Sequence, residues 1–492
     1  MQKNIFMHIV IFICLILYSL LLFVIMGFTS RKANNETYYI GNRRSPWFVV
    51  AYGMIGASLS GVTFLSVPGD VYNTQFTYFG IVIGYIVGYI VIAKVLLPLY
   101  YRLNLTSIYS YLGQRFGNSS YKTGSFFFIL SRLLGSALRM YLVIYILQEF
   151  VFRHWNIPIA ATASFFVLII LLYTFKGGIK TIVWTDTLQT TFFLAALIFM
   201  MVFVLKDMNM SLGQIVNEMQ VREYTKVFNL DWREHNFFLK QILSGAFITI
   251  TMTGLDQDMM QKNLTCKNLK DAQRNMFTFS GILVFVNALF LLMGGMLIIY
   301  SIHNGIDIAA MKTDRIFSTV AFDYLPPIGG IIFVIGLISA GYSSADGTLT
   351  ALTTVLCVDF IGLEKMNKSE KEKIKIRTGI HILMGLLFLL VILVFSRYHN
   401  DALIRILFQV ASFTYGPLLG LYAFGLFTKR TLKFDRFVPL FACLSPLICL
   451  FLHKFSEQLF GGYVFGFELL LVNGLIMFCF LWIGSKKGNL SV

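Results

Sequence analysis

The sequence predicts an all-α integral membrane protein with about thirteen transmembrane helices. Of its 492 residues, 57% are hydrophobic and only 13% are charged, and 49 are phenylalanine. A water-soluble domain cannot cover its surface with so few charges, whereas a chain embedded in a bilayer can. Apolar runs of about twenty residues, the length at which a helix crosses the hydrocarbon layer, recur throughout the chain. We therefore expect a single transmembrane domain over residues 1–492.

The expected helices form one initial span, two groups of five spans and a final pair. We place them at 8–28, 46–68, 77–101, 123–151, 157–175, 181–205, 238–258, 275–301, 326–360, 376–396, 402–427, 435–453 and 464–484. Two longer polar segments, 206–236 and 302–324, lie between spans on the same side of the membrane. Each is long enough for one short amphipathic helix, and a solvated connector is the equally open alternative.

Basic residues concentrate in alternate loops, and this bias predicts the orientation of the chain. The basic loops are 31–44, 102–122, 176–180, 262–274, 365–377, 429–436 and 486–487. Because loops rich in Lys and Arg stay in the cytoplasm, we expect the N-terminus outside the plasma (inner) membrane and the C-terminus inside the cell. The same bias explains the net charge of +16. The lipid bilayer is thus the expected partner, and nucleic acid is not.

Span 326–360 carries a polar stripe. Ser339, Ser343, Asp346, Thr350 and Thr354 follow one another at steps of four, three, four and four, so they share one face of a helix. An interhelical hydrogen-bond seam is one explanation, because Ser and Thr pack helices together well. A carboxylate inside an apolar span is expensive, however, and is tolerated mainly where it pairs, lines a water-filled path or binds an ion. The stripe therefore favours an ion or substrate pathway.

Two spans look discontinuous, and they lie five spans apart. Span 46–68 contains three glycines among hydroxyl residues and ends at Pro68, and span 238–258 is similarly rich in Ser, Thr and Gly. Unwinding in mid-membrane is tolerated only around a cavity. Interrupted spans at matching positions of two halves point to a transporter site between inverted repeats, here 46–205 and 238–427. Glycine-rich packing faces are the competing explanation, and they account poorly for the five-span register.

Asp186 lies about one and a half turns inside span 181–205. If it faces Ser343 and Asp346, the three side chains form a cation site of hard oxygen ligands, which suit sodium. The alternative is an interfacial Asp that caps a helix or pairs with Lys180.

Arg132 and Arg139 lie seven residues apart, and therefore on one face of span 123–151. An Arg that cannot reach the interface must face a cavity or a partner. Its planar donor fork suits a carboxylate-bearing substrate. The alternatives are a structural pair with a buried acid such as Asp346 or Glu149, or a position near the membrane interface.

The end of span 238–258 carries Asp256 and Gln257. Because this end is expected at the cytoplasmic face, its acids should be solvated or paired with nearby lysines. We interpret Asp256 and Gln257 as an intracellular gate rather than as direct ligands.

Nothing in the sequence indicates an enzyme. The seven histidines form no His-Glu-x-x-His cluster, and the six cysteines lack metal-ligand spacing. We expect no catalytic residue and no cofactor. A transporter-like sensor or a channel is the alternative class, although the former needs a signalling domain and the latter repeated filter sequences.

Three segments resemble signatures of the sodium/solute symporter family, which includes bacterial sialic acid, proline and galactose carriers and the sodium–glucose transporters. They are Gly177-Gly178 with Trp184-Thr185-Asp186, Asp256-Gln257 with Gln261-Lys262-Asn263-Leu264, and Ser343-Ser344. The resemblance extends over all thirteen expected spans. It implies a leucine-transporter-type five-plus-five inverted-repeat core, with an extra helix at 8–28 and two more at 435–484.

The resemblance also implies ligands for the coupling ion, sodium. The principal site would take the carbonyl oxygens of Gly56, Leu59 and Ala340 and the hydroxyls of Ser343 and Ser344. Some members have a second sodium site, in which Asp186 would take part. Here Asp346 and Gly347 stand where those members place hydroxyls, so this second site is altered or absent.

Substrate contacts in the family come from the first broken helix and from the third and sixth core helices. They map to Ser58, Ser60, Thr63, Thr253 and either Arg132 or Arg139. The resulting expectation is a sodium-driven symporter for a small organic solute, with a carboxylate-bearing solute favoured and a sugar or neutral amino acid as the alternative.

Overall fold

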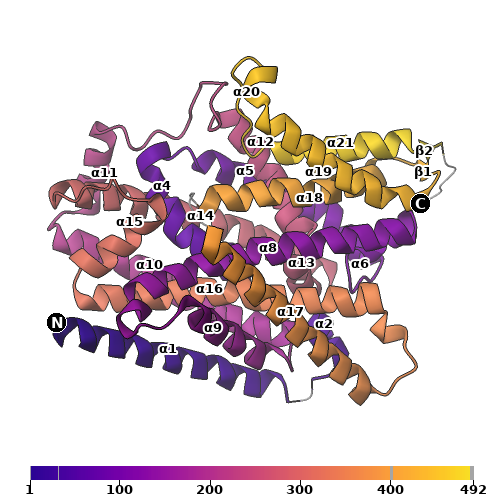
Figure 1. Ribbon diagram of the computed structural model, residues 1–492, viewed down its shortest axis with the longest axis horizontal. Helices are drawn as coiled ribbons and strands as arrows, with labels where there is room; N and C mark the ends of the chain where they lie inside the picture. The colour runs from indigo at the N-terminus through magenta and orange to yellow at the C-terminus, as the bar shows by residue number, and fades with distance from the viewer. Residues whose placement is uncertain (1, 32, 399–402, 488–492) are drawn as a thin grey trace.

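The computed structural model describes residues 2–31, 33–398 and 403–487, and these fold into a bundle of long helices that run roughly side by side (Figure 1). The longer helices are α1 (Gln2–Thr29), α3 (Trp47–Ser58), α4 (Gly61–Thr74), α5 (Phe79–Val91), α8 (Asn118–Phe150), α9 (Ile159–Thr174), α10 (Ile179–Asp207), α12 (Phe238–Thr249), α14 (Leu269–His303), α16 (Pro327–Val355), α17 (Glu370–Tyr398), α18 (Leu403–Phe427), α19 (Val438–Lys454) and α21 (Leu469–Ile483).

Short elements connect these helices. The short α-helices are α2 (Asn35–Ile40), α6 (Leu97–Arg102), α7 (Ser110–Arg115), α11 (Leu212–Val221), α13 (Gln257–Leu264), α15 (Thr313–Thr319) and α20 (Ser456–Leu459). Four π-helical turns, η2 (Ile92–Leu96), η4 (Ile250–Gly254), η5 (Val320–Tyr324) and η6 (Leu356–Ile361), continue the α-helices before them. Single 3₁₀ turns lie at Gly41–Arg43, Phe152–Trp155, Leu363–Lys365 and Asp435–Phe437. Strands β1 (Thr431–Leu432) and β2 (Ser485–Lys486) pair antiparallel.

Within the described residues, nine helices are long and apolar enough to cross a membrane, and up to eleven if each of two bent pairs counts as one span. The bent pairs are α3 with α4, at 58°, and α12–η4 with α13, at 64°. Helices α9 and α21 are apolar but shorter. Each expected span overlaps one of these helices or bent pairs, although the ends differ: the helix expected from residue 464, for example, begins at Leu469. Residue 402 lies outside the described residues. The polar segments 206–236 and 302–324 each contain one short helix, α11 and α15 respectively.

The first bent pair differs from expectation at its far end. Pro68 does not end the span, because α4 begins only at Gly61 and continues through Pro68 to Thr74. The interruption lies earlier, at Leu59 and Ser60, whose backbones are extended (ψ 97° and 178°). Proline within a helix lacks one hydrogen bond, and here the surrounding packing holds the helix together.

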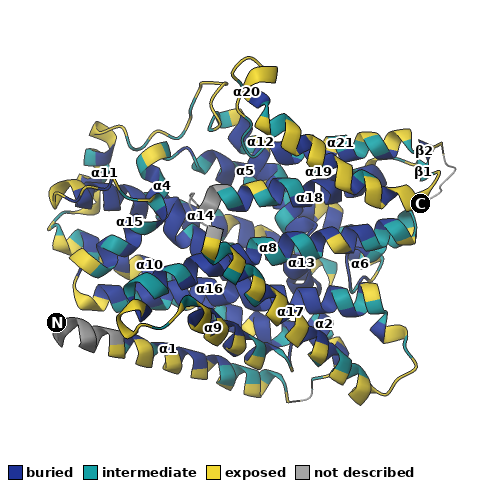
Figure 2. Cartoon of the chain, viewed as in Figure 1, coloured by how far each residue is buried: buried dark blue, intermediate teal, exposed yellow. Residues whose placement is uncertain are grey.

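Burial separates a protein-enclosed centre from a periphery that can face lipid (Figure 2). In α16, 78% of the most apolar window is buried, whereas in α1 and α19 the figures are 28% and 22%. Helix α16 packs against α8 and α10, and α10 packs against α3. The polar stripe of the sequence therefore lies in the centre of the bundle and not on its surface.

Candidate functional site

The first helix break faces the middle of α16. The Ser343 hydroxyl donates a hydrogen bond to the Gly56 carbonyl oxygen at 2.8 Å, and it lies 3.3 Å from the Ala340 carbonyl oxygen. The Ser344 hydroxyl donates to the same Ala340 oxygen at 2.9 Å. Four of the five expected sodium ligands thus lie together, fully buried. Leu59, the fifth, lies at the break itself.

The carbonyl groups freed at the two helix breaks have different partners. In the second break, the Gly254 and Leu255 carbonyl oxygens accept hydrogen bonds from Tyr100 and Tyr109, at 2.8 and 2.9 Å. Each of these carbonyls thus accepts from a tyrosine hydroxyl. In the first break the Gly56 carbonyl meets a serine hydroxyl that can rotate towards an ion. The geometry therefore favours a cation site at the first break.

Helix α10 fixes the first break from the other side. The Gly56 amide donates to the Thr190 hydroxyl at 3.0 Å, and this hydroxyl lies 3.3 Å from the Gly53 carbonyl oxygen. A Cβ atom on Gly56 would stand 2.5 Å from the Thr190 oxygen, so only glycine allows this approach. This contact of Thr190 was not predicted from the sequence.

Five buried charged side chains near the two breaks form a chain of ion pairs. The Lys262 ammonium lies 2.9 Å from Asp186 and 3.5 Å from Asp258. The Arg132 guanidinium contacts Asp258 and lies 3.6 Å from Asp256. The contact between Lys262 and Asp186 is thus an ion pair buried away from bulk water.

This chain of ion pairs corrects one expectation from the sequence. Asp256 and Asp258 are not solvated, because their side chains have no exposed surface. Asp258 does pair with a nearby lysine, Lys262, and both acids pair with Arg132. The reason is that α13, which follows the 64° bend, is buried along its whole length.

The residues expected for a second cation site are not gathered into one ligand set. Asp186 contacts Lys262, and not Lys180. Asp346 accepts hydrogen bonds from the Tyr173 hydroxyl at 2.8 Å and the Gln189 amide at 3.3 Å. Ser343 points to the first break. Among the described residues, no group of three or more His, Cys, Asp or Glu side chains is arranged to hold a metal ion.

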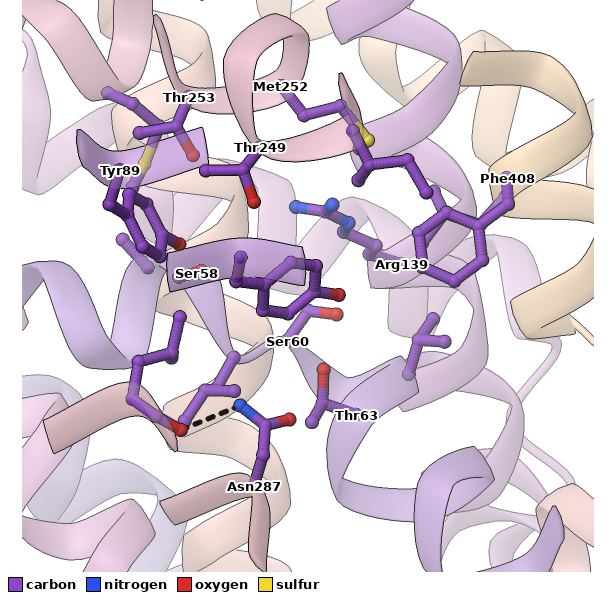
Figure 3. A pocket seen from close by; sticks show the side chains of 18 of the residues that line it. Ser58, Ser60, Thr63, Tyr89, Arg139, Thr249, Met252, Thr253, Asn287 and Phe408 are labelled. Atoms are coloured by element: carbon purple, nitrogen blue, oxygen red, sulfur yellow. Dashed lines mark hydrogen bonds between the residues drawn. The ribbon is translucent and has the colours of Figure 1, made fainter. Parts of the chain in front are cut away.

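A cavity of about 70 Å³ lies beside the two breaks (Figure 3). All six residues expected to contact substrate line it: Ser58, Ser60, Thr63, Arg132, Arg139 and Thr253. In Figure 3 the Arg139 guanidinium reaches towards Thr249 from across the cavity. The two breaks and α8 therefore present their polar groups to one space.

The two arginines of α8 differ in their partners. Arg132 is held by Asp256 and Asp258, and not by Asp346 or Glu149. Glu149 pairs instead with Arg153 and Arg315, at 3.2 and 3.0 Å. Among the described residues, no carboxylate lies within ion-pair distance of Arg139, and its buried Nε has no hydrogen-bond partner. A buried charge without a partner is costly, so Arg139 is the group that an anion would satisfy.

Several lining residues were not expected from the sequence. Tyr78, Tyr85 and Tyr89 line the cavity from α5 and the residue before it, and the Tyr78 and Tyr85 hydroxyls lie 3.1 Å apart. Their spacing of seven and four residues on one helical face was the available signal. Asn287 of α14 also lines the cavity, and its side-chain oxygen has no partner. An isolated amide in an apolar span could have indicated it.

The surroundings of the cavity differ at its two ends. A larger pocket of about 640 Å³ lies at the end of α4 and the loops 233–236 and 462–467, and Tyr78 lines both spaces. A third pocket, at 103–122 and 358–365, shares no lining residue with the cavity. The cavity thus shares a wall with the second pocket and none with the third.

The expected gate residues lie between the cavity and the third pocket. Asp256 pairs with Arg132, which lines the cavity, and Gln257 binds Thr106, which lines the third pocket. The Tyr415 hydroxyl donates to Asp256 at 2.5 Å. Gln257 accepts from the Ile108 amide at 2.9 Å and donates to the Thr106 carbonyl at 2.8 Å. Both residues therefore tie the start of α13 to neighbouring segments.

A bundle with two broken helices around a buried polar cavity is the architecture of secondary transporters. The profile of the sodium:solute symporter family matches residues 38–434, so the chain belongs to the sodium:solute symporter family. This confirms the family that the motifs resemble and the class of sodium-coupled symporters.

Relatives and solved structures agree with this membership. The sodium/sialic acid symporter NanT of Aliivibrio fischeri is 22% identical over 410 residues, covering 82% of this chain and 80% of that one. The sodium-coupled monocarboxylate transporter 1 of Mus musculus is 25% identical over 405 residues, covering 80% and 64%.

A substrate-bound, outward-open Na⁺-coupled sialic acid symporter has a similar fold, with a TM-score of 0.83 at 19% identity over 98% of this chain and 99% of that one. Mhp1, a nucleobase-cation-symport-1 family transporter, gives a TM-score of 0.55 at 13% identity, over 90% and 92%. The fold is therefore that of these transporters.

Proposed function

We propose that this symporter imports a small carboxylate-bearing solute by alternating access, with sodium bound between α3 and α16. The single observation that carries the choice of solute is the unpaired, buried Arg139 in the cavity. A guanidinium binds a carboxylate through two parallel hydrogen bonds, which gives both affinity and orientation. The names of the relatives agree, because sialic acids and monocarboxylates carry this group.

In this proposal the principal sodium site consists of Gly56, Leu59, Ala340, Ser343 and Ser344. The hydroxyl that now donates to the Gly56 carbonyl would turn its oxygen to the ion, and both oxygens would become ligands. Sodium would thus hold α3 against α16 and order the cavity for the solute, which Ser58, Ser60, Thr63 and Thr253 would contact from the breaks.

The transport cycle would use the two repeats, 46–205 and 238–427, within thirteen spans. With the N-terminus outside and the C-terminus in the cytoplasm, the pocket next to Tyr78 opens to the exterior. The contacts of Asp256 and Gln257 would then close the cytoplasmic path, as a gate must do in the sodium-loading state.

The experiment is uptake into proteoliposomes under an inward sodium gradient, with a panel of monocarboxylates, sialic acids, sugars and neutral amino acids. We expect uptake of acids only. Arg139→Gln should abolish it, and Arg139→Lys should retain part of it. The matched control is Arg153→Gln, at an exposed site beyond the end of the same helix. Uptake of a sugar or neutral amino acid that survives Arg139→Gln would contradict the proposed solute class.

A further inference from the structure

Lys262 places an ammonium group beside the carboxylate expected to bind a second sodium ion. Its Nζ lies 2.9 Å from Asp186 and 3.5 Å from Asp258. The lysine side chain is 1% exposed and the two carboxylates 1% and 0%, so none of these charges is satisfied by bulk water. The position of a second cation is therefore already filled by a positive charge that belongs to the chain.

The other potential ligands at this position are also engaged. Asp346 accepts from Tyr173 and Gln189 on one oxygen and from the Gly347 amide on the other. Position 347 offers no side-chain oxygen, and it has no room for one. A Cβ atom there would stand 2.3 Å from the Asp258 carboxylate.

The absence of a side chain at Gly347 is thus linked to the ion-pair chain. Glycine allows α16 to approach Asp258, and Asp258 connects Lys262 with Arg132. Any hydroxyl residue at 347 would displace the Asp258 carboxylate from its present position between Lys262 and Arg132. Glycine at position 347 therefore has two effects. It offers no side-chain ligand to a second cation, and it leaves room for the Asp258 carboxylate that pairs with Lys262.

We propose that Lys262 is the resident cation of the second site, so that the chain binds and couples one sodium ion per transport cycle. This inference rests on the proposed function. A second sodium would have to displace a buried ammonium from Asp186 and leave it with Asp258 alone, which Arg132 already contacts. With one sodium and a solute of charge −1, the net charge moved in each cycle is zero.

The test measures equilibrium binding of ²²Na⁺ to the purified full-length protein in detergent, without any solute. We expect one sodium per chain and a hyperbolic binding curve. Two sodium ions per chain would overturn the inference and leave the proposed function intact. No sodium binding at all would instead contradict the proposed function, so the two failures are distinguishable.

Three variants test the role of the lysine. Lys262→Gln frees Asp186 and should bind a second sodium ion, weakly because Asp346 stays engaged. A folded variant whose sodium binding is identical to that of the wild type contradicts the role of Lys262. Lys262→Arg keeps the charge and should bind one. Asp186→Asn should also still bind one, since Asp186 is not a sodium ligand in this account. If Lys262→Gln does not fold, loss of sodium binding in Asp186→Asn overturns the inference.

Discussion

The Ser343 hydroxyl lies 2.8 Å from the Gly56 carbonyl oxygen and joins the middle of α16 to the last full turn of α3. Both atoms are oxygens in a buried environment, and the carbonyl belongs to a helix that ends two residues later. This contact depends on the separation of the two helices. An ion bound here would therefore sense the relative position of the two halves of the bundle, which is the requirement for coupling sodium to solute movement.

The first prediction concerns this contact. Ser343→Ala removes one oxygen ligand, and we expect sodium affinity to fall about tenfold, or roughly 1.4 kcal/mol. The measurement is the sodium concentration that gives half-maximal ²²Na⁺ binding. Ser339→Ala is the control, because Ser339 is buried in the same helix and donates only to Ile335. Equal losses of sodium affinity in the two variants would show that Ser343 is not a sodium ligand.

The second prediction separates the two arginines of α8 by stability. Arg132→Gln leaves Asp256 and Asp258 with a missing partner, and we expect a loss of roughly 3–5 kcal/mol in the free energy of unfolding. Arg139→Gln removes a buried charge that has no partner, so stability should stay the same or rise. Thermal unfolding in detergent measures both. A larger loss in Arg139→Gln than in Arg132→Gln would contradict the assigned pairing.

The third prediction concerns the close approach at Gly347. Gly347→Ala brings a methyl group against Asp258, and we expect a loss of about 1–3 kcal/mol in stability. Gly379→Ala is the control, because a Cβ atom there meets nothing within 4 Å and alanine favours a helix. If Gly347→Ala unfolds at the same temperature as the control, α16 does not pack tightly against Asp258 at this position.

The fourth prediction concerns the gate. Gln257→Ala removes the acceptor of the Ile108 amide and the donor to Thr106, so the segment 103–109 should open more often. Hydrogen exchange read by mass spectrometry should show faster exchange of a peptide that covers Ile108. A peptide of α14 should exchange as in the wild type. Unchanged exchange at Ile108 would show that Gln257 does not hold this segment.

Sequence periodicity and composition predicted the parts of the fold that depend on local physics. The apolar runs marked the helices, and the glycine and hydroxyl clusters marked both bent pairs. The position of the first break could not be placed, because Pro68 looks like a stronger helix terminator than Leu59 or Ser60. Packing around α4 decides where the helix breaks, and a single sequence does not show which residues pack there.

The partners of buried charges were the least predictable part of the site. Asp186 had a plausible partner in Lys180, six residues earlier in the chain, but the bend at α13 brings Lys262 to it instead. Arg132 and Arg139 share a helical face and looked equivalent. Only the tertiary arrangement shows that the first is neutralised by two acids and that the second is not.

The most direct test of sodium-coupled transport through this site is solute uptake into proteoliposomes of the wild type and the Ser343→Ala, Ser344→Ala double variant. An inward sodium gradient should drive accumulation by the wild type, whereas an equal potassium gradient should not. The double variant should lose the sodium stimulation. Equal uptake in sodium and potassium, or full sodium stimulation in the double variant, would contradict the account.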